Sequence, residues 1–366
     1  MPRKLVTLRK VKDINPIKKA DMIERLTVDG WDVVAQKDEF EVGDVGVFFE
    51  VDSGLPVEDS RYDFLSKGGS KDFHGKQVYR IRTMRLRGVI SQGLLKPLAE
   101  YPEIENYLKV NEISLDDAVE QRLDFSEMLD VIKYEPPLKV RGADAAGGFP
   151  FWIRKTDQER INNVYDIMEA DHKHDEFVAT LKMDGSSTTV AYITDKEKFY
   201  DTLPVDDEGG QFILCSRNQA LKDDGNSAFH AAIDNLNLRD KIKEYHLRTG
   251  KNIALQGELL GKGVQGTREK IYDYTIHFFS AYDIDEQVYL PWDDLKLLCN
   301  ELDVPHVKEL GQFKPFEEFS SVEEFIDYAN NIDPVFADIP EGVVFHEVNG
   351  SASFKSISTK YLLKFE

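Results

Sequence analysis

The residues with the clearest chemical potential lie in the segment Lys182-Met-Asp184-Gly185-Ser-Ser187, which directly follows an apolar run typical of a β-strand. A lysine at the end of a strand can be desolvated and lose its proton, and its amine is then a nucleophile. Asp184 points to the same side as Lys182, because side chains two residues apart share a face of an extended chain. Its carboxylate can therefore help to hold a metal ion beside the amine. Gly185 permits a tight turn against a ligand. On these residues alone, a plain charged turn is the alternative.

The segment resembles motif I of the covalent nucleotidyltransferases, the superfamily of RNA and DNA ligases and capping enzymes. Further segments on predicted strands resemble the other motifs of that superfamily in the same order: Ser216-Arg217-Asn218, Gln256-Gly257-Glu258-Leu259, Phe278-Phe279-Ser-Ala-Tyr-Asp283-Ile284, Glu341-Gly342-Val343-Val344 and Ser353-Phe354-Lys355-Ser-Ile-Ser-Thr-Lys360. Each match is weak alone, but the ordered set is specific.

A narrower resemblance covers nearly the whole chain. The lysine motif, a β-rich N-terminal region and the segment Arg85-Leu-Arg-Gly-Val-Ile-Ser-Gln-Gly93-Leu-Leu-Lys-Pro97 look like the Deinococcus/Naegleria-type nick-sealing RNA ligases. That family carries an oligonucleotide-binding (OB) barrel before its catalytic domain. The resemblance implies ATP and Mg²⁺ or Mn²⁺ as cofactors, and RNA or an RNA-containing nicked duplex as the partner.

The resemblance also implies roles for five catalytic residues. Lys182 would attack the α-phosphate of ATP and form a lysyl–AMP bond. Asp184, Glu258 and Glu341 would hold the metal directly or through water, since Mg²⁺ usually keeps several waters. Lys355 would neutralise charge on the α-phosphate.

The nucleotide contacts implied by the resemblance form a larger set. They are Thr180, Leu181, Lys182, Arg217, Glu258, Phe279, Glu341, Lys355, Arg160, Lys155 and Lys360. Strand alternation puts Phe278 and Phe279 on opposite faces, so that one belongs to the core and the other can stack on adenine. The family pattern favours Phe279 for the stacking role.

Three cationic positions have an alternative interpretation. Arg160 and Lys155 would hold the β- and γ-phosphates in the family arrangement, but the same stretch is equally typical of a helix start capped by Thr156 or Asp157. Lys360 either replaces the second lysine that many ligases show in motif V or is only a surface charge.

Short apolar runs separated by glycine and aspartate predict a small β-barrel over residues 1–97, with strands over 31–35, 45–51, 78–82 and 89–95. Residues two apart on a strand share a face, so we expect Arg80 to share a face with Arg82, and Arg85 with Arg87. These four arginines are candidate nucleic-acid contacts. A solvated strand edge is the alternative.

The pattern changes after residue 97. Over residues 98–149 the sequence predicts an acidic segment with one or two short helices, in stretches such as 115–129, and then a glycine-rich linker over 142–150. Residues 150–366 mix predicted helices over 158–169 and 226–248 with strands over 177–182, 188–193, 211–216, 253–259, 276–284, 342–348 and 353–357. The expected fold is α+β, with an OB-type barrel at 1–97 and an adenylyltransferase domain of antiparallel sheets flanked by helices at 150–366.

Composition excludes some classes of protein. The 366 residues include 46 Lys and Arg against 67 Asp and Glu, a net charge of −21, which argues against non-specific adhesion to nucleic acid. Residues 1–97 are slightly basic, so the charge distribution is compatible with nucleic-acid contact through one face. No apolar run approaches the roughly 18 residues of a spanning helix, and the charged N-terminus predicts no secretion signal. Two cysteines form no disulfide framework, and we expect a cytoplasmic location.

These observations together predict an ATP-dependent RNA ligase that joins a 3′-OH RNA end to a 5′-phosphate end, at nicks in duplexes. We expect a monomer without a membrane or protein partner. The alternatives are a DNA ligase or capping-type nucleotidyltransferase, and a non-catalytic nucleic-acid-binding protein on a ligase scaffold.

Overall fold

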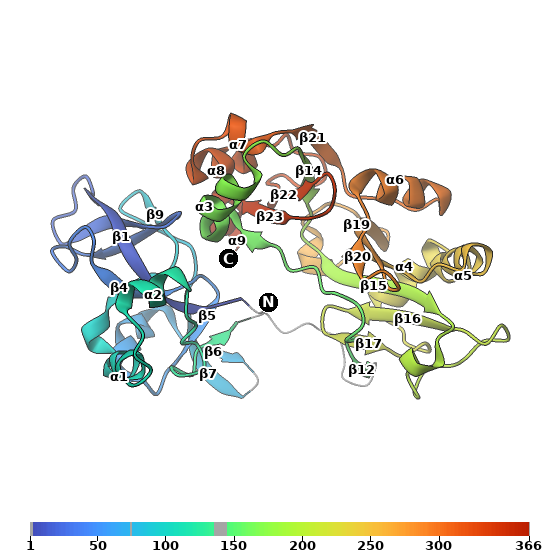
Figure 1. Cartoon of the computed structure of the whole chain (residues 1–366), viewed down its shortest axis with the longest axis horizontal. Coiled ribbons are helices and arrows are strands. Elements are labelled where there is room, and N and C mark those ends of the chain that lie inside the picture. The colour runs from blue at the N-terminus through green and yellow to red at the C-terminus, as the bar shows by residue number, and fades with distance from the viewer. Residues whose placement is uncertain (1–2, 74, 135–144, 366) are drawn as a thin grey trace. The chain divides into compact units, whose positions relative to one another are not determined.

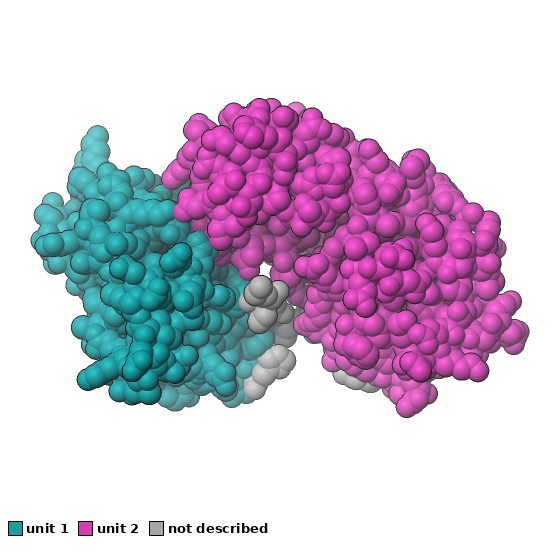
Figure 2. All heavy atoms as spheres, viewed as in Figure 1, with its two compact units in different colours: residues 1–138, 362–366 teal, residues 139–361 magenta. Residues whose placement is uncertain are grey.

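The computed structural model describes residues 3–73, 75–134 and 145–365 (Figure 1). The chain divides into two compact units, residues 1–138 with 362–366 and residues 139–361 (Figure 2). Each unit combines antiparallel sheets with helices, so the predicted α+β class is confirmed. Within the described ranges, none of the helices has the length and apolar character needed to span a bilayer.

Unit 1 is built on a five-stranded antiparallel sheet in the order β10-β4-β1-β2-β3. Its strands are β1 (Val6–Pro16), β2 (Ile23–Val28), β3 (Trp31–Gln36), β4 (Val45–Phe49) and β10 (Leu94–Pro97). Buried and half-buried residues alternate along β2 and β3, as expected for strands with one face on a core. The strand predicted over 89–95 is wrong in its length. Gly93, at φ +107°, lies against Phe48 and separates β9 (Val89–Ser91) from β10.

A second sheet of unit 1 has the order β11-β5-β7-β6, with β5 (Ser53–Pro56), β6 (Lys71–Phe73), β7 (Lys76–Arg80) and β11 (Ile132–Lys133). The predicted pairing of four arginines on strand faces is wrong here. β7 ends at Arg80, Arg82 lies beyond it, Arg85 is the middle residue of β8 (Met84–Leu86), and Arg87 forms the β8–β9 turn at φ +49°.

The acidic segment after residue 97 completes the core of unit 1. Its helices are α1 (Pro102–Val110) and α2 (Leu115–Glu120), beside the 3-10 helices Ser60–Gly68 and Leu98–Glu100. The expected one or two short helices are confirmed as α1 and α2, although the helical spacing seen over 115–129 continues only to residue 120, and Arg122 then has φ +50°. Phe125 and Leu129 then pack into the same cluster as Phe49 and Tyr62.

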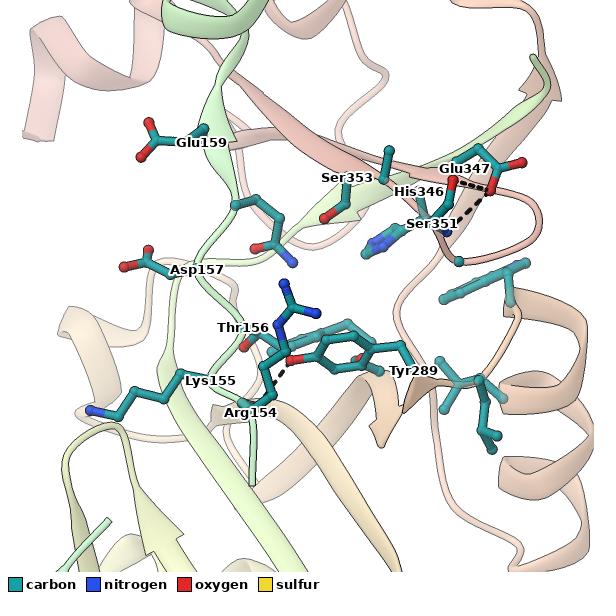
Figure 3. A pocket seen from close by; sticks show the side chains of 18 of the residues that line it. Arg154, Lys155, Thr156, Asp157, Glu159, Tyr289, His346, Glu347, Ser351 and Ser353 are labelled. Atoms are coloured by element: carbon teal, nitrogen blue, oxygen red, sulfur yellow. Dashed lines mark hydrogen bonds between the residues drawn. The ribbon is translucent and has the colours of Figure 1, made fainter. Parts of the chain in front are cut away.

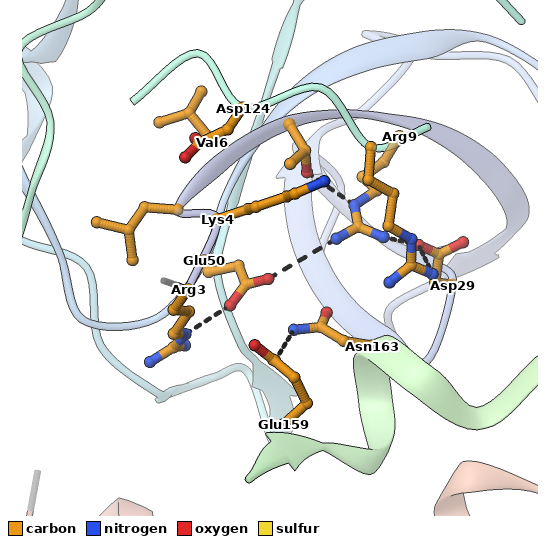
Figure 4. A network of polar contacts seen from close by, with 12 residues as sticks. Arg3, Lys4, Val6, Arg9, Asp29, Glu50, Asp124, Glu159 and Asn163 are labelled. Atoms are coloured by element: carbon orange, nitrogen blue, oxygen red, sulfur yellow. Dashed lines mark hydrogen bonds and ion pairs between the residues drawn. The ribbon is translucent and has the colours of Figure 1, made fainter. Parts of the chain in front are cut away.

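A buried ion network also stabilises unit 1 (Figure 4). Glu50, 1% exposed, accepts a hydrogen bond from Arg3 at 2.8 Å and lies 3.7 Å from the Arg9 guanidinium. Arg9, 2% exposed, donates to Thr7 and to Asp29. Each buried charge thus has partners, as burial of charge requires.

Unit 2 contains a seven-stranded antiparallel sheet in the order β12-β17-β16-β15-β18-β19-β20. The strands are β12 (Ala145–Gly148), β15 (Ser186–Ile193), β16 (Gln211–Ser216), β17 (Gln219–Leu221), β18 (Ile253–Leu260), β19 (Thr275–Asp283) and β20 (Val288–Tyr289). The linker predicted over 142–150 is corrected in part, because residues 145–148 pair with β17, while residues 142–144 lie outside the described residues.

The five-stranded sheet of unit 2 has the order β13-β23-β22-β14-β21. Its strands are β13 (Glu159–Arg160), β14 (Phe177–Lys182), β21 (Glu309–Phe313), β22 (Gly342–Glu347) and β23 (Ser353–Ile357). Only β13 runs parallel to its neighbour. β14 belongs to this sheet and β15 to the seven-stranded one, so the chain passes between the two sheets at residues 183–185.

The helices of unit 2 flank these sheets (Figure 1). They are α3 (Ile161–His172), α4 (Ala228–Asn235), α5 (Leu238–Thr249), α6 (Trp292–Glu301), α7 (Pro315–Glu318), α8 (Val322–Asn330) and α9 (Thr359–Phe365), which reaches into the 362–366 segment, with 3-10 helices Lys196–Lys198 and Val264–Thr267. The helix predicted over 226–248 is two helices, because Asn237 turns the chain at φ +47°. The helix predicted over 158–169 begins at Ile161, because β13 precedes it.

Candidate active site

Lys182 is the last residue of β14, a strand whose other side chains are all buried. Its Nζ lies 2.8 Å from Glu341 Oε2. The strand register explains the contact, since Lys182 pairs with Gly342, the residue after Glu341. Burial alone would lower the pKa of the Lys182 ammonium, but the charges of Glu341 and Glu258 outweigh burial and raise it. The lysine is therefore held as a cation.

Three side chains hold the turn that follows Lys182. The Asp184 N–H donates to Glu269 Oε1 at 2.8 Å, and the Gly185 N–H donates to Glu258 Oε1 at 3.0 Å. Arg268 donates to Asp184 Oδ2 at 2.6 Å. A Cβ on Gly185 would lie 2.2 Å from the Leu259 carbonyl oxygen, so the close approach of this turn to β18 requires glycine.

Several carboxyl groups gather around Lys182. Burial raises the pKa of Glu258 to about 8 and that of Glu269 to about 7. Neighbouring carboxylates add to both shifts, while Lys182 opposes them. Acidic groups gathered around one half-buried amine favour a bound cation, because added positive charge would relieve their mutual repulsion.

The predicted metal ligands are Asp184, Glu258 and Glu341. Their oxygens suit Mg²⁺ or Mn²⁺. Among residues 3–73, 75–134 and 145–365, however, no three or more His, Cys, Asp or Glu side chains are grouped so that they could hold a metal ion by themselves. The donor chemistry therefore fits an ion whose shell is completed by water or ligand oxygens, and the ligand set stays a prediction.

The five-stranded sheet brings further predicted residues to the lysine face. Thr180 of β14 pairs with Val344 of β22, and Val344 pairs with Lys355 of β23. Lys355 in turn pairs with Arg160 of β13. Residues directly opposite on neighbouring strands, and residues two apart on one strand, share a face, so this row lies on the face of Lys182. Thr180 Oγ1 donates to the Val344 carbonyl, and Arg160 is 7% exposed.

Leu181 is 3% exposed, and its N–H donates to the Lys308 carbonyl at 2.8 Å. This bond ties the strand that carries Lys182 to the chain just before β21. Contacts of Thr180 and Leu181 with a nucleotide stay a prediction.

A cavity of about 370 Å³ opens on the same sheet face at His346 and Ser353, and Lys182 and its carboxylate partners are not among the residues that line it (Figure 3). Phe279 and Lys155 line it, together with Arg154, Trp292 and His346. Phe278 is fully buried in the core, whereas Phe279 is half-buried, because a β-bulge leaves it as the extra residue between the pairs of β18 and β19. The stacking of Phe279 on adenine stays a prediction.

The remaining predicted nucleotide contacts have protein partners. Lys155 Nζ donates to Asn218 Oδ1 at 2.9 Å, and Arg217 lies 3.5 Å from Asp157. Lys360 Nζ donates to the Asn330 carbonyl at 2.8 Å, at the end of α8. That contact gives Lys360 a structural role, without testing its part in catalysis.

The arginine candidates of unit 1 differ in their surroundings. Arg80 is ion-paired with Asp52 at 2.7 Å and lies over the Tyr134 ring. Arg82, Arg85 and Arg87 are exposed, and none forms an ion pair with any residue that the structure describes.

Sequence reasoning missed Arg268, Glu269 and Tyr361. Arg268 contacts both Asp184 and the Tyr361 hydroxyl, and Glu269 is 5% exposed. The available signal was the glycine-rich run over 261–266, directly after the strand that carries Glu258.

Comparisons with known proteins agree with this architecture. The sequence profile of the RNA ligase family matches residues 175–362, and that of an OB-fold domain matches residues 5–98. A comparison with curated protein sequences gave no match.

Solved structures of an RNA ligase from Naegleria gruberi are similar over the whole chain. The structure with pyrophosphate and a variant with AMP and Mn each give a TM-score of 0.83, at 34% identity over 98% of both chains. A second variant, with ATP and Mn, gives 0.82 at the same identity and coverage. An OB-fold domain precedes the region that the ligase profile matches, and the chain belongs to the RNA ligase family.

Proposed function

We propose that this protein is an ATP-dependent RNA ligase that adenylates itself on Lys182. The observation that carries the proposal is the Lys182–Glu341 pair, 2.8 Å apart, with side chains 24% and 16% exposed and with the carboxyl groups of Glu258 and Asp184 nearby. The similar Naegleria structures contain ATP or AMP together with Mn, which supports the same cofactors here.

In the first step the Lys182 amine attacks the α-phosphorus of ATP. A bond forms between Nζ and phosphorus, and the bond to the pyrophosphate oxygen breaks. The ammonium must first lose a proton, and Glu341 Oε2 is the base within reach. Lys355 and Arg160 would neutralise phosphate oxygens, and their pairing on one sheet face supports that role.

The predicted cation has a limited and defined part. A divalent metal would supply positive charge beside the amine and the α-phosphate, which favours the neutral amine. Asp184, Glu258 and Glu341 would hold it, directly or through water.

Two further steps complete the proposed reaction. AMP passes from Lys182 to a 5′-phosphate, forming a pyrophosphate bond as the lysyl–phosphorus bond breaks. A 3′-OH then attacks that 5′-phosphorus, the phosphodiester forms and AMP leaves. The family resemblance supports an RNA 3′-OH strand at a nick. Exposed Arg82, Arg85 and Arg87 support duplex contact through unit 1.

The intact mass of the protein after incubation with ATP and Mg²⁺ or Mn²⁺ tests the first step. We expect a gain of one AMP that a Lys182→Ala variant lacks. Nicked duplexes with an RNA or a DNA 3′-OH strand then test the substrate. The absence of an adduct with ATP would overturn the proposal, and an adduct with GTP alone would indicate a capping-type enzyme.

A further inference from the structure

The loop between β18 and β19 has an unusual backbone. Its residues with positive φ are Gly261, Gly263, Gln265 (+42°), Gly266, Thr267 (+59°) and Lys270 (+53°). A β-branched residue such as Thr267 pays a steric cost in this region. Such conformations persist only where the surroundings enforce them, and they cluster at functional sites.

Three consecutive residues fix this 261–270 loop to the active site. Arg268 donates to Asp184 Oδ2 at 2.6 Å and to the Tyr361 hydroxyl at 2.9 Å. Glu269 accepts the Asp184 N–H at 2.8 Å. Lys270 is ion-paired with Asp338, three residues before Glu341.

We propose that Arg268 is a positioning residue for self-adenylation, which orients the Asp184 carboxylate beside Lys182. This inference rests on the proposed function. The Asp184 side chain is 12% exposed and that of Arg268 is 30% exposed, so the pair is partly shielded from water.

The need for such a residue follows from the local charge. Glu258, Glu269 and Glu341 lie around the same turn, and whichever of them is ionised repels the Asp184 carboxylate. A guanidinium stays charged at every working pH and can bind two acceptors in a fixed plane. Arg268 uses that geometry, with the Tyr361 hydroxyl as its second acceptor. Partners that orient a ligating carboxylate typically change metal affinity or activity by about 10- to 100-fold when removed.

The test compares Arg268→Ala and Arg268→Lys with wild type in single-turnover self-adenylation across a Mn²⁺ series. We expect Arg268→Ala to slow adenylation by about 10- to 100-fold and to raise the Mn²⁺ concentration needed for half the maximal rate. Arg268→Lys should recover part of the rate, because it keeps the charge but loses the planar geometry. An Arg239→Ala variant removes a comparable ion pair with Asp223 outside the site, and it is the matched control.

A double-mutant cycle separates positioning from general damage to the fold. In an Asp184→Asn background, Arg268→Ala should cause no further loss, because there is no carboxylate left to orient. A second readout is ATP binding with Mn²⁺, measured by calorimetry in a non-reactive Lys182→Met background, where Arg268→Ala should weaken binding. Thermal unfolding of each variant shows whether the fold is intact.

The outcomes distinguish this inference from the proposed function. If wild type forms no AMP adduct, the proposed function fails. The positioning role alone is overturned if wild type forms the adduct and the Arg268→Ala variant forms it at the same rate. It is also overturned if Arg268→Ala slows adenylation by the same factor in the Asp184→Asn background as in wild type.

Discussion

At the scale of single residues, Gly185 shows how closely the catalytic turn is built against β18. A Cβ there would lie 2.2 Å from the Leu259 carbonyl oxygen and 2.8 Å from Glu258 Cγ. We expect Gly185→Ala to destabilise the protein by about 1–3 kcal/mol, the usual cost of overpacking, and to abolish most self-adenylation by displacing Glu258.

Gly148→Ala is the matched control, because nothing lies within 4 Å of the position where its Cβ would stand. Chemical unfolding and adduct mass measure the two effects. A Gly185→Ala variant as stable and active as Gly148→Ala would contradict the packing argument.

Phe278 and Phe279 give a second prediction, because adjacent residues have opposite surroundings. Phe278 is fully buried, and we expect Phe278→Ala to cost about 3–5 kcal/mol of unfolding free energy. Phe279 lines the cavity, and Phe279→Ala should change stability little and weaken ATP binding. Denaturant unfolding and calorimetric titration with ATP separate the two. Equal stability losses with unchanged ATP affinity would remove the stacking role.

The candidate site shows what a sequence can and cannot supply at this scale. Lys182, Asp184 and Glu341 follow from motif order, because the chemistry demands those residue types. Arg268 and Tyr361 do not, because their roles depend on a long-range hydrogen bond between a loop and α9. No local spacing encodes that contact.

At the scale of elements, β22 carries a half-buried histidine with a predictable effect on stability. Burial lowers the pKa of His346 to about 4, and its ring stacks on Trp292 of α6. An unfolded histidine titrates near 6.5, so between pH 6.5 and 4 the unfolded chain binds the proton and the folded one does not.

Stability should therefore fall as pH decreases through that window, by at most about 3 kcal/mol from this residue. His346→Gln should flatten the dependence, measured as urea unfolding free energies at pH 5 and pH 7. His174→Gln, at a side chain that is 77% exposed, is the control. An unchanged slope in His346→Gln would show that other groups cause the acid sensitivity.

The ion network of unit 1 gives a prediction about β4 and its neighbours. Glu50→Gln would leave buried Arg9 without this carboxylate, and removal of one partner from a buried pair typically costs about 3–5 kcal/mol. Asp116→Asn removes a surface pair with Lys10 and should change stability by less than about 1 kcal/mol. Thermal unfolding compares them. Similar melting temperatures for the two variants would mean that the network contributes little.

Elements were predicted best where apolar runs are bounded by clear turn residues. The strands at 211–216 and 353–357 match the structure, because their burial and their ends are both local properties. The single helix over 226–248 failed because Asn237 carries a positive φ that its residue type permits but does not require. The helical spacing over 115–129 does not continue past Glu120, because Phe125 and Leu129 are buried by tertiary packing in the core of unit 1.

At the scale of the whole molecule, the net charge limits where a nucleic acid can bind. The net charge of −21 must repel a nucleic acid from most of the surface. Arg82, Arg85 and Arg87 are exposed and have no ion-pair partner in the part of the chain that the structure describes. We therefore expect these arginines to contribute to duplex contact, whereas the residues proposed for self-adenylation all lie in unit 2.

This division predicts that the two activities can be separated. The combined variant Arg82→Ala, Arg85→Ala and Arg87→Ala should keep wild-type self-adenylation, because Lys182 and its partners are untouched. Its binding to a nicked duplex should weaken, and the slope of log affinity against log salt should flatten by up to about 0.9 per lost phosphate contact. Sealing should fall with binding.

Arg80→Ala, at an arginine already paired with Asp52, should change the salt slope less. A triple variant with an unchanged salt slope and normal sealing would assign duplex contact to other residues, and the arginines would then serve only to keep this hairpin edge solvated.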